Sequence, residues 1–176
     1  YTTTVPTGSI TFKDLGGAVF FQFGPISRNA FKAADIPQKV KEAFLATEDR
    51  RFYQHHGVDY QGIVRAIATN IVSRDMAEGG STLTQQLARL SFLNQERSVI
   101  RKLREARLAQ KIETQLTKNE ILERYLNQVY LGSGAYGVGD AAWVYFSKPI
   151  NELNLAQIAT LAGLPAAPSL YSPFIK

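Results

Sequence analysis

Two adjacent helix signals between residues 99 and 129 constrain the fold more than any other feature. Apolar residues from Ile100 to Leu116 recur at three- and four-residue spacing, which is typical of one helix face. Thr117 and Glu120 follow at the spacing of a capping box, so a second helix is predicted to start there. The apolar positions of the first helix are Ile100, Leu103, Ala106, Ala109, Ile112 and Leu116. Those of the second are Ile121, Leu122, Tyr125, Leu126 and Val129, and it is predicted to stop at Gly132.

Four further helices are predicted, three of them behind a residue that caps helices well. The predicted caps are Asp35 (with Pro37 in the first turn), Asp59 and Ser81, and the fourth helix is predicted to start at Asn154-Leu155-Ala156-Gln157. The predicted apolar positions of the first three are Val40, Ala43, Phe44 and Thr47; Ile63, Ile67 and Ile71; and Leu83, Leu87 and Leu90. The last helix is predicted to end at Gly163 and Pro165.

Strand signals are confined to the N-terminal part of the chain. Residues 10–23 partly alternate between apolar and polar types around Gly16 and Gly17, which predicts a short hairpin. The chain has 176 residues, the size of one domain. We therefore predict one mainly α domain over residues 1–176 with a small β-hairpin-like N-terminal segment, to which residues 1–35 add little.

The charge balance limits the classes of partner. A net charge of +5 favours anionic partners such as nucleic acid, phospholipid headgroups or a phosphorylated substrate. Nucleic acid is not expected, because no aromatics interleave with the basic residues between 97 and 111 and no nucleic-acid motif is present. The chain has no cysteine, which excludes disulfides and Cys-ligated metals.

Membrane and targeting signals are missing from the sequence itself. No run approaches the ~18 apolar residues that suggest a membrane span. No secretory signal is visible, and the chain starts at Tyr1 rather than Met. We expect an excised fragment, so the absence of a membrane anchor from this sequence says little about the native protein.

Two acids stand out as candidates for proton transfer. Glu48 and Asp49 end a predicted helix, and aromatic residues including Phe52 follow them. A carboxylate packed against aromatic side chains would have a raised pKa and serve as a general base. The alternative is that both acids lie at a solvated helix end. His55 more often has a structural role in such a loop, and the two histidines of the chain are too few for a zinc site.

A third acid, Glu105, lies in a basic run with Arg101 and Lys102. Arg and Lys side chains bind phosphate oxygens, so this run favours a diphosphate site in which the acid handles a proton or a cation. The alternative is a solvated helix face with a surface ion pair between Arg101 and Glu105, which are four residues apart.

Two more helices carry polar groups. A glycine turn at Gly80 leads into a predicted helix N-terminus, which offers free N–H groups to an anion, unless it is an ordinary capped helix. Neutral side chains add donors there: Ser81, Thr82, Gln85 and Gln86. Glu123 and Asn127 form a polar face on a later helix whose strong apolar face favours scaffolding.

Together these segments resemble the family 51 glycosyltransferases, the peptidoglycan polymerase domains of class A penicillin-binding proteins and monofunctional transglycosylases. The resemblance covers residues 36–174 and rests on five blocks in the family's order. The blocks are Glu48-Asp49-Arg50-Arg51-Phe52 with His55 and Gly57; residues 80–88; Arg101-Lys102-x-x-Glu105; Ile121-Leu122-Glu123-x-Tyr125-Leu126-Asn127 to Gly137; and Ala141-Ala142 to Pro165. One departure is visible: Arg89-Leu90 stands where the family usually has Lys-Asn, so the role of that asparagine is in doubt here.

The resemblance implies a lysozyme-like, two-lobed α fold that polymerises lipid II into β-1,4 glycan strands with inversion. It implies Glu48 as general base, Arg101 and Lys102 as the groups that stabilise the diphosphate, and Glu105 as the organiser of that site, either directly or through a divalent cation (Mg²⁺ or Mn²⁺). Substrate-binding positions carried over from the family are Asp49, Phe52, His55, Gly80, Ser81, Thr82, Gln85, Gln86, Arg89, Glu123 and Asn127.

The same resemblance implies where the domain works and with what. Its partners would be lipid II, the growing glycan strand and the membrane surface at the extracytoplasmic (periplasmic) face of a bacterial cell membrane. A fused transpeptidase domain or other cell-wall synthesis proteins are expected beside it. Apolar side chains that would contact the bilayer are Ile67, Ile71, Val72 and Met76. Two rival functions stay open: a peptidoglycan-cleaving muramidase or lytic transglycosylase, and a non-catalytic glycan- or membrane-binding module.

Overall fold

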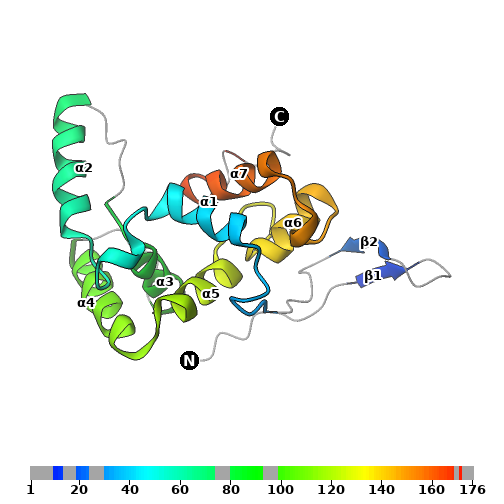
Figure 1. Cartoon of the computed structure of the whole chain (residues 1–176), viewed down its shortest axis with the longest axis horizontal. Helices are drawn as coiled ribbons and strands as arrows, with labels where there is room; N and C mark the ends of the chain where they lie inside the picture. The colour runs from blue at the N-terminus through cyan, green and yellow to red at the C-terminus, as the bar shows by residue number, and fades with distance from the viewer. Residues whose placement is uncertain are drawn as a thin grey trace.

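The computed structural model describes residues 10–13, 19–23, 30–73, 80–92, 99–168 and 171, with only the backbone for 10–13, 19–23, 67–73 and 92 (Figure 1). The α-helices in these ranges are α1 (Gln38–Glu48), α2 (Tyr60–Ser73), α3 (Leu83–Phe92), α4 (Val99–Gln115), α5 (Lys118–Gln128), α6 (Val138–Phe146) and α7 (Leu155–Gly163). Short 3-10 turns lie at Phe52–Gln54, Ile150–Glu152 and Leu164–Ala166. The prediction of a mainly helical domain is confirmed.

The predicted N-terminal hairpin is also confirmed. Strands β1 (Ile10–Lys13) and β2 (Val19–Phe23) pair antiparallel, with Ile10 opposite Phe23. The register shifts after Phe12, so the pairing is irregular near the turn. In Figure 1 the hairpin lies at the edge of the helical body, on the side opposite α2 and α4.

The helices enclose one apolar core. Helix α3 packs against both α4 and α5, and α1 packs against α7 (Figure 1). Large side chains from these helices are almost fully buried: Phe44, Leu83, Ile121, Leu122, Tyr125, Leu126 and Leu161. Because α1, α3 and α5 all contribute to this core, the C-terminal end of α1 and the N-terminal end of α3 are held close together, and a polar cavity forms beside them.

The capping box predicted at Thr117 and Glu120 is confirmed, and the helix predicted to start at Asn154 begins with a second box. Thr117 and Glu120 form the reciprocal capping box of α5, and Asn154 and Gln157 form that of α7. Asp59 directly precedes α2, and its carbonyl accepts the N–H of Ile63 at 3.0 Å. Helix α5 ends at Gln128 and not at Gly132 as predicted, because Val129 already has an extended ψ of 131°.

Two predicted caps were wrong. Pro37, not Asp35, precedes the first residue of α1, and no side chain caps that helix; its ψ of 139° keeps the chain extended until Gln38. Thr82 rather than Ser81 caps α3: its Oγ1 accepts the N–H of Gln85 at 3.1 Å, and Gln85 Oε1 accepts the N–H of Thr82 at 2.9 Å.

The apolar face predicted for α3 and the first half of α4 was partly wrong. Leu90, Ile100 and Leu103 are exposed, at 43%, 63% and 67%. Ala109 and Ile112 are buried as predicted, and Glu105 joins them on the buried side of α4. Contact with α3 decides which side of α4 is buried, and that contact encloses the carboxylate while Ile100 and Leu103 remain exposed.

The bilayer-facing prediction for Ile67, Ile71, Val72 and Met76 lies outside the described side chains. None of the helices in the described part of the chain combines the length and apolar character needed to cross a bilayer.

Candidate active site

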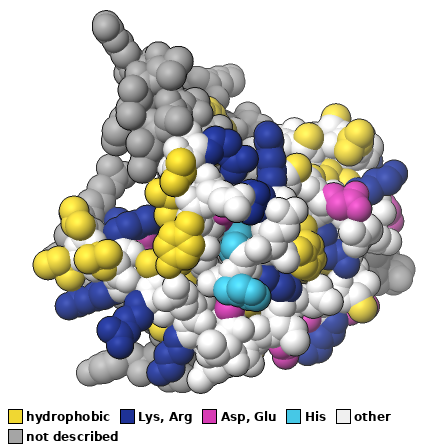
Figure 2. All heavy atoms as spheres, turned by 60° about the vertical axis from the view of Figure 1, so that its left-hand side comes forward, with side chains coloured by type: hydrophobic (Ala, Val, Ile, Leu, Met, Phe, Trp, Pro, Cys, Tyr) yellow, Lys and Arg dark blue, Asp and Glu magenta, His cyan; other side chains and the backbone are white. Residues whose placement is uncertain are grey.

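A cavity of about 560 Å³ opens between the C-terminal end of α1, the first turns of α2 and α3, and the turn after α7. This is a usual size for a small-molecule site. Its lining is polar and carries four arginines and three acids: Thr47, Glu48, Asp49, Arg50, Arg51, Asp59, Gly62, Arg65, Ala66, Gly80, Ser81, Thr82, Gln86, Arg89, Pro165 and Ala166. Figure 2 shows one face of the molecule on which basic side chains are spread around both histidines and outnumber the acidic ones.

Glu48, the last residue of α1, presents its carboxylate to this cavity. Its Oε2 accepts a hydrogen bond from Nε2 of Gln86 on α3 at 2.7 Å. Burial raises the pKa of Glu48 above its ordinary value, the Gln86 bond and the charge of Arg89 lower this pKa, and Asp49 raises it. Burial dominates, so Glu48 has the properties of a general base whose proton affinity exceeds that of an exposed glutamate.

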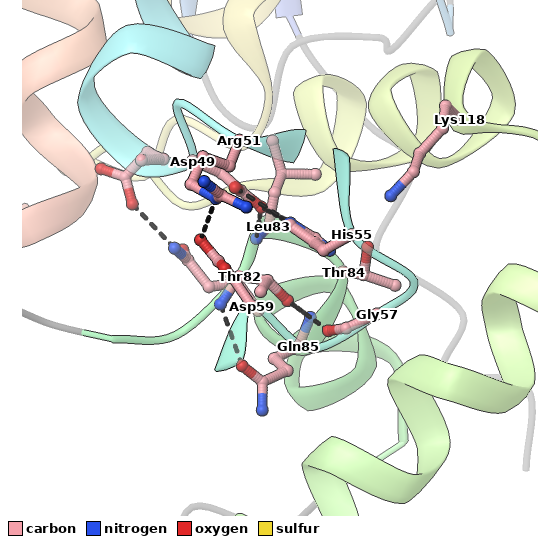
Figure 3. Close-up of polar contacts among 12 residues, drawn as sticks. Asp49, Arg51, His55, Gly57, Asp59, Thr82, Leu83, Thr84, Gln85 and Lys118 are labelled. Atoms are coloured by element: carbon pink, nitrogen blue, oxygen red, sulfur yellow. Dashed lines mark hydrogen bonds and ion pairs between the residues drawn. The ribbon is translucent and has the colours of Figure 1, made fainter. Parts of the chain in front are cut away.

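Asp49 points away from the solvent and fixes the loop that follows α1. Its Oδ2 accepts the backbone N–H of Leu83 at 2.9 Å, and both of its oxygens lie 3.0 Å from Nε2 of His55 (Figure 3). The other ring nitrogen of His55 is buried without a hydrogen-bond partner in the described part of the structure. Because a carboxylate only accepts hydrogen bonds, Nε2 of His55 is the donor to Asp49. Asp49 and His55 thus connect the Glu48 loop to the start of α3.

A second link to α3 comes from Gly57. The hydroxyl of Thr82 donates to the carbonyl of Gly57 at 2.6 Å (Figure 3). Gly57 has a φ of +83°, and a Cβ there would lie 2.7 Å from the carbonyl carbon of Ala109 on α4. The loop therefore touches the α4 backbone so closely that only glycine fits.

The acid predicted at the diphosphate site, Glu105, is 1% exposed and lies beside two basic side chains. Its Oε1 accepts from Nη1 of Arg101, and its Oε2 lies 3.1 Å from Nζ of Lys102. The same Nζ donates to the hydroxyl of Ser81, which lines the cavity. Glu105 therefore holds two basic side chains beside the cavity without lining it.

The prediction of a divalent cation at Glu105 can be compared with these contacts. Both carboxylate oxygens of Glu105 are already bound by Arg101 and Lys102. No cluster of three or more His, Asp or Glu side chains with ligand geometry occurs among the residues that the structure describes. The residues around Glu105 therefore do not fit a bound Mg²⁺ or Mn²⁺.

The structure brings most of the predicted site residues together. The cavity is lined by seven of them: Glu48, Asp49, Gly80, Ser81, Thr82, Gln86 and Arg89. A second group lies beside the cavity, connected to it by the bond from Lys102 to Ser81: Arg101, Lys102 and Glu105. His55 and Gln85 are buried behind it, where they bind Asp49 and Thr82. Gly80, before α3, packs near Ile63 of α2, so the turn is close to the backbone of that helix.

Three predicted positions lie elsewhere. Phe52 is 1% exposed in the core, with Nζ of Lys118 4.4 Å from its ring centroid. Glu123 accepts the N–H of Ala33 at 2.8 Å. Asn127 accepts the N–H of Phe31 and donates to the same residue's carbonyl, both at 2.9 Å. Their assignment to substrate binding stays a prediction, but each makes contacts that hold the domain together.

Sequence reasoning missed four charged residues that line the cavity: Arg50, Arg51, Asp59 and Arg65. Arg50 and Arg51 lie inside the motif that was singled out, so their position beside Glu48 was a usable signal. Arg51 Nε lies 3.2 Å from Oδ2 of Asp59 (Figure 3). Arg65 has no such local signal, because only the packing of α2 beside the motif brings it there.

Comparison with known proteins decides the family. A family model described as Transglycosylase matches residues 17–176. The chain belongs to the transglycosylase family. It is 46% identical over 171 residues to penicillin-binding protein 1A of Neisseria cinerea, and 51% identical over 157 residues to penicillin-binding protein 1A of Escherichia coli. These alignments cover 97% and 89% of this chain but only 21% and 18% of the relatives.

The transglycosylase assignment confirms the predicted resemblance and identifies the chain as a peptidoglycan glycosyltransferase domain. The chain spans about a fifth of the length of the curated relatives it matches.

Proposed function

We propose that this transglycosylase domain polymerises lipid II, with Glu48 as the general base. The observation that carries the proposal is the position of Glu48: a partly buried carboxylate, with a pKa raised by burial, lines a cavity together with four arginines. A base beside several arginine side chains suits a reaction that deprotonates a sugar hydroxyl and expels an anion.

In the proposed step, the 4-hydroxyl oxygen of the acceptor sugar attacks the anomeric carbon of the growing strand. The new C–O bond forms as the bond between that carbon and the diphosphate oxygen breaks. The hydroxyl proton passes to Glu48, and the electron pair of the broken bond leaves with undecaprenyl diphosphate. One displacement inverts the α-linked donor to a β-1,4 link, so no covalent enzyme intermediate is needed.

The cationic groups supply the other half of the catalysis. A diphosphate leaves readily when its charge is neutralised, so no acid is needed to protonate it, unlike the sugar leaving group of a hydrolase. Arg101 and Lys102, held by Glu105 beside Ser81, would stabilise this charge electrostatically. Arg89 on α3 adds a further positive charge near Glu48.

The rest of the proposal concerns the whole protein. The polyprenyl tail of lipid II stays in the bilayer, so the domain would work against the extracytoplasmic face of the membrane, where its net charge of +5 favours anionic headgroups. The relatives are about five times longer than the aligned region. We therefore expect a fused transpeptidase domain in the complete protein.

The test is incubation of the domain with labelled lipid II in detergent, with products resolved on a gel. Wild type should give a ladder of glycan strands. Glu48→Gln and Glu105→Gln should each lose the ladder while retaining lipid II binding. Glu42→Gln is the matched control, because Glu42 is exposed on the same helix as Glu48 and accepts a hydrogen bond from the exposed side chain of Gln38.

Three results would reject the proposal. Shortening of preformed glycan without polymerisation would indicate a muramidase or lytic transglycosylase. A full ladder from Glu48→Gln would show that Glu48 is not the base. Binding without any turnover by wild type, in a preparation that is folded by circular dichroism, would indicate a glycan- or membrane-binding module.

A further inference from the structure

A chain of hydrogen bonds runs from the core to the proposed base across three helices. The hydroxyl of Tyr125 on α5 donates to Oε1 of Gln86 on α3 at 3.1 Å. Nε2 of the same amide donates to Oε2 of Glu48 at 2.7 Å. Tyr125 is 0% exposed, so its hydroxyl has no access to bulk water as an alternative partner.

The chemistry of the three groups decides the direction of these bonds. An ionised carboxylate only accepts, so the amide must turn its NH₂ group toward Glu48. A phenol hydroxyl that donates to Oε1 favours the same orientation of the amide. If the amide were rotated by half a turn, its oxygen would face the carboxylate oxygen, which favours a protonated Glu48 that can donate to it.

We propose that Tyr125 is a positioning residue for the transglycosylase base: its buried hydroxyl holds the Gln86 amide in the orientation that donates to Glu48. The inference rests on the proposed function, in which Glu48 is the base. Tyr125 acts through Gln86 and need not contact the substrate.

The state of the phenol supports this role. Burial first, and the charge of Glu48 second, raise the pKa of Tyr125 well above its ordinary value, while Arg89 lowers it. Tyr125 therefore keeps its proton over the whole working pH range and stays a donor to Gln86. Its position is also fixed, since its ring belongs to the core that α5 forms with α3.

Other charges that affect Glu48 must be kept constant in any test. Asp49 lies beside it at the end of α1, and Arg89 reaches it from α3. Arg50, Arg51, Asp59 and Arg65 line the same cavity. Helix α7, packed against α1, has no titratable residue between 155 and 163. Tyr125→Phe leaves all of these groups in place and preserves the buried ring.

The experiment measures the pKa of Glu48 directly and the pH dependence of turnover separately. Carboxyl resonances of ¹³C-labelled glutamate are titrated by NMR, and Glu48→Gln identifies the Glu48 signal. In Tyr125→Phe the Glu48 pKa should rise by roughly half a unit to one unit, because the stabilising donor is no longer fixed. The acidic limb of the kcat/KM profile for lipid II should move in the same direction.

Two further variants separate this role from general loosening of the core. Tyr145→Phe removes another tyrosine hydroxyl, one that donates to the carbonyl of Leu131 at 2.8 Å, and should leave the Glu48 pKa unchanged. Gln86→Leu should raise the Glu48 pKa, and adding Tyr125→Phe to it should have no further effect, because the two act in one chain.

Failure of the positioning role and failure of the proposed function give different results. An unchanged Glu48 pKa in Tyr125→Phe, or full additivity with Gln86→Leu, overturns the positioning role and leaves the proposed function untouched. A shifted Glu48 pKa with an unmoved acidic limb shows that Glu48 is not the base, which overturns the proposed function and the catalytic meaning of Tyr125 together.

Discussion

Nε2 of His55 lies 3.0 Å from both carboxylate oxygens of Asp49, and one of these oxygens also accepts the backbone N–H of Leu83 at the start of α3. Asp49 follows Glu48 directly in sequence, yet its carboxylate points into the protein. The two adjacent acids therefore have different tasks: Glu48 lines the cavity with a carboxylate available to substrate, and Asp49 fixes the backbone that holds Glu48.

This division predicts that Asp49→Ala destabilises the domain strongly. The substitution leaves two buried donors, His55 and the Leu83 N–H, without an acceptor, at about 1–3 kcal/mol each. Urea unfolding should show a loss of about 3 kcal/mol or more. Asp35→Ala is the control, since Asp35 is exposed and does not cap α1, and it should change stability by less than about 0.5 kcal/mol. Equal stability of the two variants would show that Asp49 does not fix the loop.

Gly57→Ala should disrupt the same loop by a different mechanism. A Cβ at Gly57 would lie 2.7 Å from the α4 backbone at Ala109 and Gln110, and φ is +83°. Gly134 has a similar φ of +77°, but a Cβ there would meet nothing within 4 Å, so Gly134→Ala isolates the cost of the backbone conformation. We expect about 1–2 kcal/mol for Gly134→Ala and at least about 2 kcal/mol more for Gly57→Ala in thermal unfolding. Matching losses would mean that the approach to α4 is not tight in solution.

Asn127→Ala tests whether the ExxxN face of α5 binds substrate or braces the fold. Asn127 makes two hydrogen bonds to the backbone of Phe31, which attach the segment before α1 to α5. Its loss should lower the unfolding free energy by roughly 1–3 kcal/mol, while KM for lipid II measured well below the melting temperature stays within about twofold. A KM raised tenfold or more in a folded variant would restore the substrate-binding assignment.

The helices were predictable from sequence where local signals agree. The Thr117–Glu120 box and the apolar residues behind it belong to one short stretch, so periodicity and capping place α5 without tertiary information. The prediction that Leu90, Ile100 and Leu103 are buried was wrong, because burial depends on which other helices pack against α3 and α4. Periodicity shows that a helix has an apolar face, but contact with α3 decides which side of α4 is buried.

The site was predictable only in part for a similar reason. Motif resemblance placed Glu48, Gln86 and Arg101 in one family site, and the structure gathers them around or beside the cavity. It did not distinguish residues that face the cavity from those that support it. Tyr125 was counted as a core residue, and nothing local to its sequence indicates that its hydroxyl reaches Gln86. That contact needs α3 and α5 side by side.

Glu48→Gln should make the domain more stable while it abolishes polymerisation. Burial raises the folded-state pKa of Glu48, so the folded protein binds this proton more readily than the unfolded chain does. Stability contributed by the protonated form is fully present below the unfolded pKa, about 4.3. It is lost as pH rises through the higher folded-state pKa. At neutral pH the charged carboxylate is therefore a cost, which a neutral amide removes while Gln86 can still donate to its oxygen.

The measurement is the difference in Tm between Glu48→Gln and wild type as a function of pH. We expect Glu48→Gln to melt about 2–4 °C higher at pH 7–8, the change that about 1 kcal/mol produces in a domain of this size. The difference should shrink toward zero below about pH 4, where wild-type Glu48 is protonated in both states. The exposed control Glu42→Gln should show no such pH-dependent gain. A Glu48→Gln variant that melts lower than wild type at neutral pH would mean that attraction from Arg89 outweighs burial, and that Glu48 is not held with the raised pKa that suits a base.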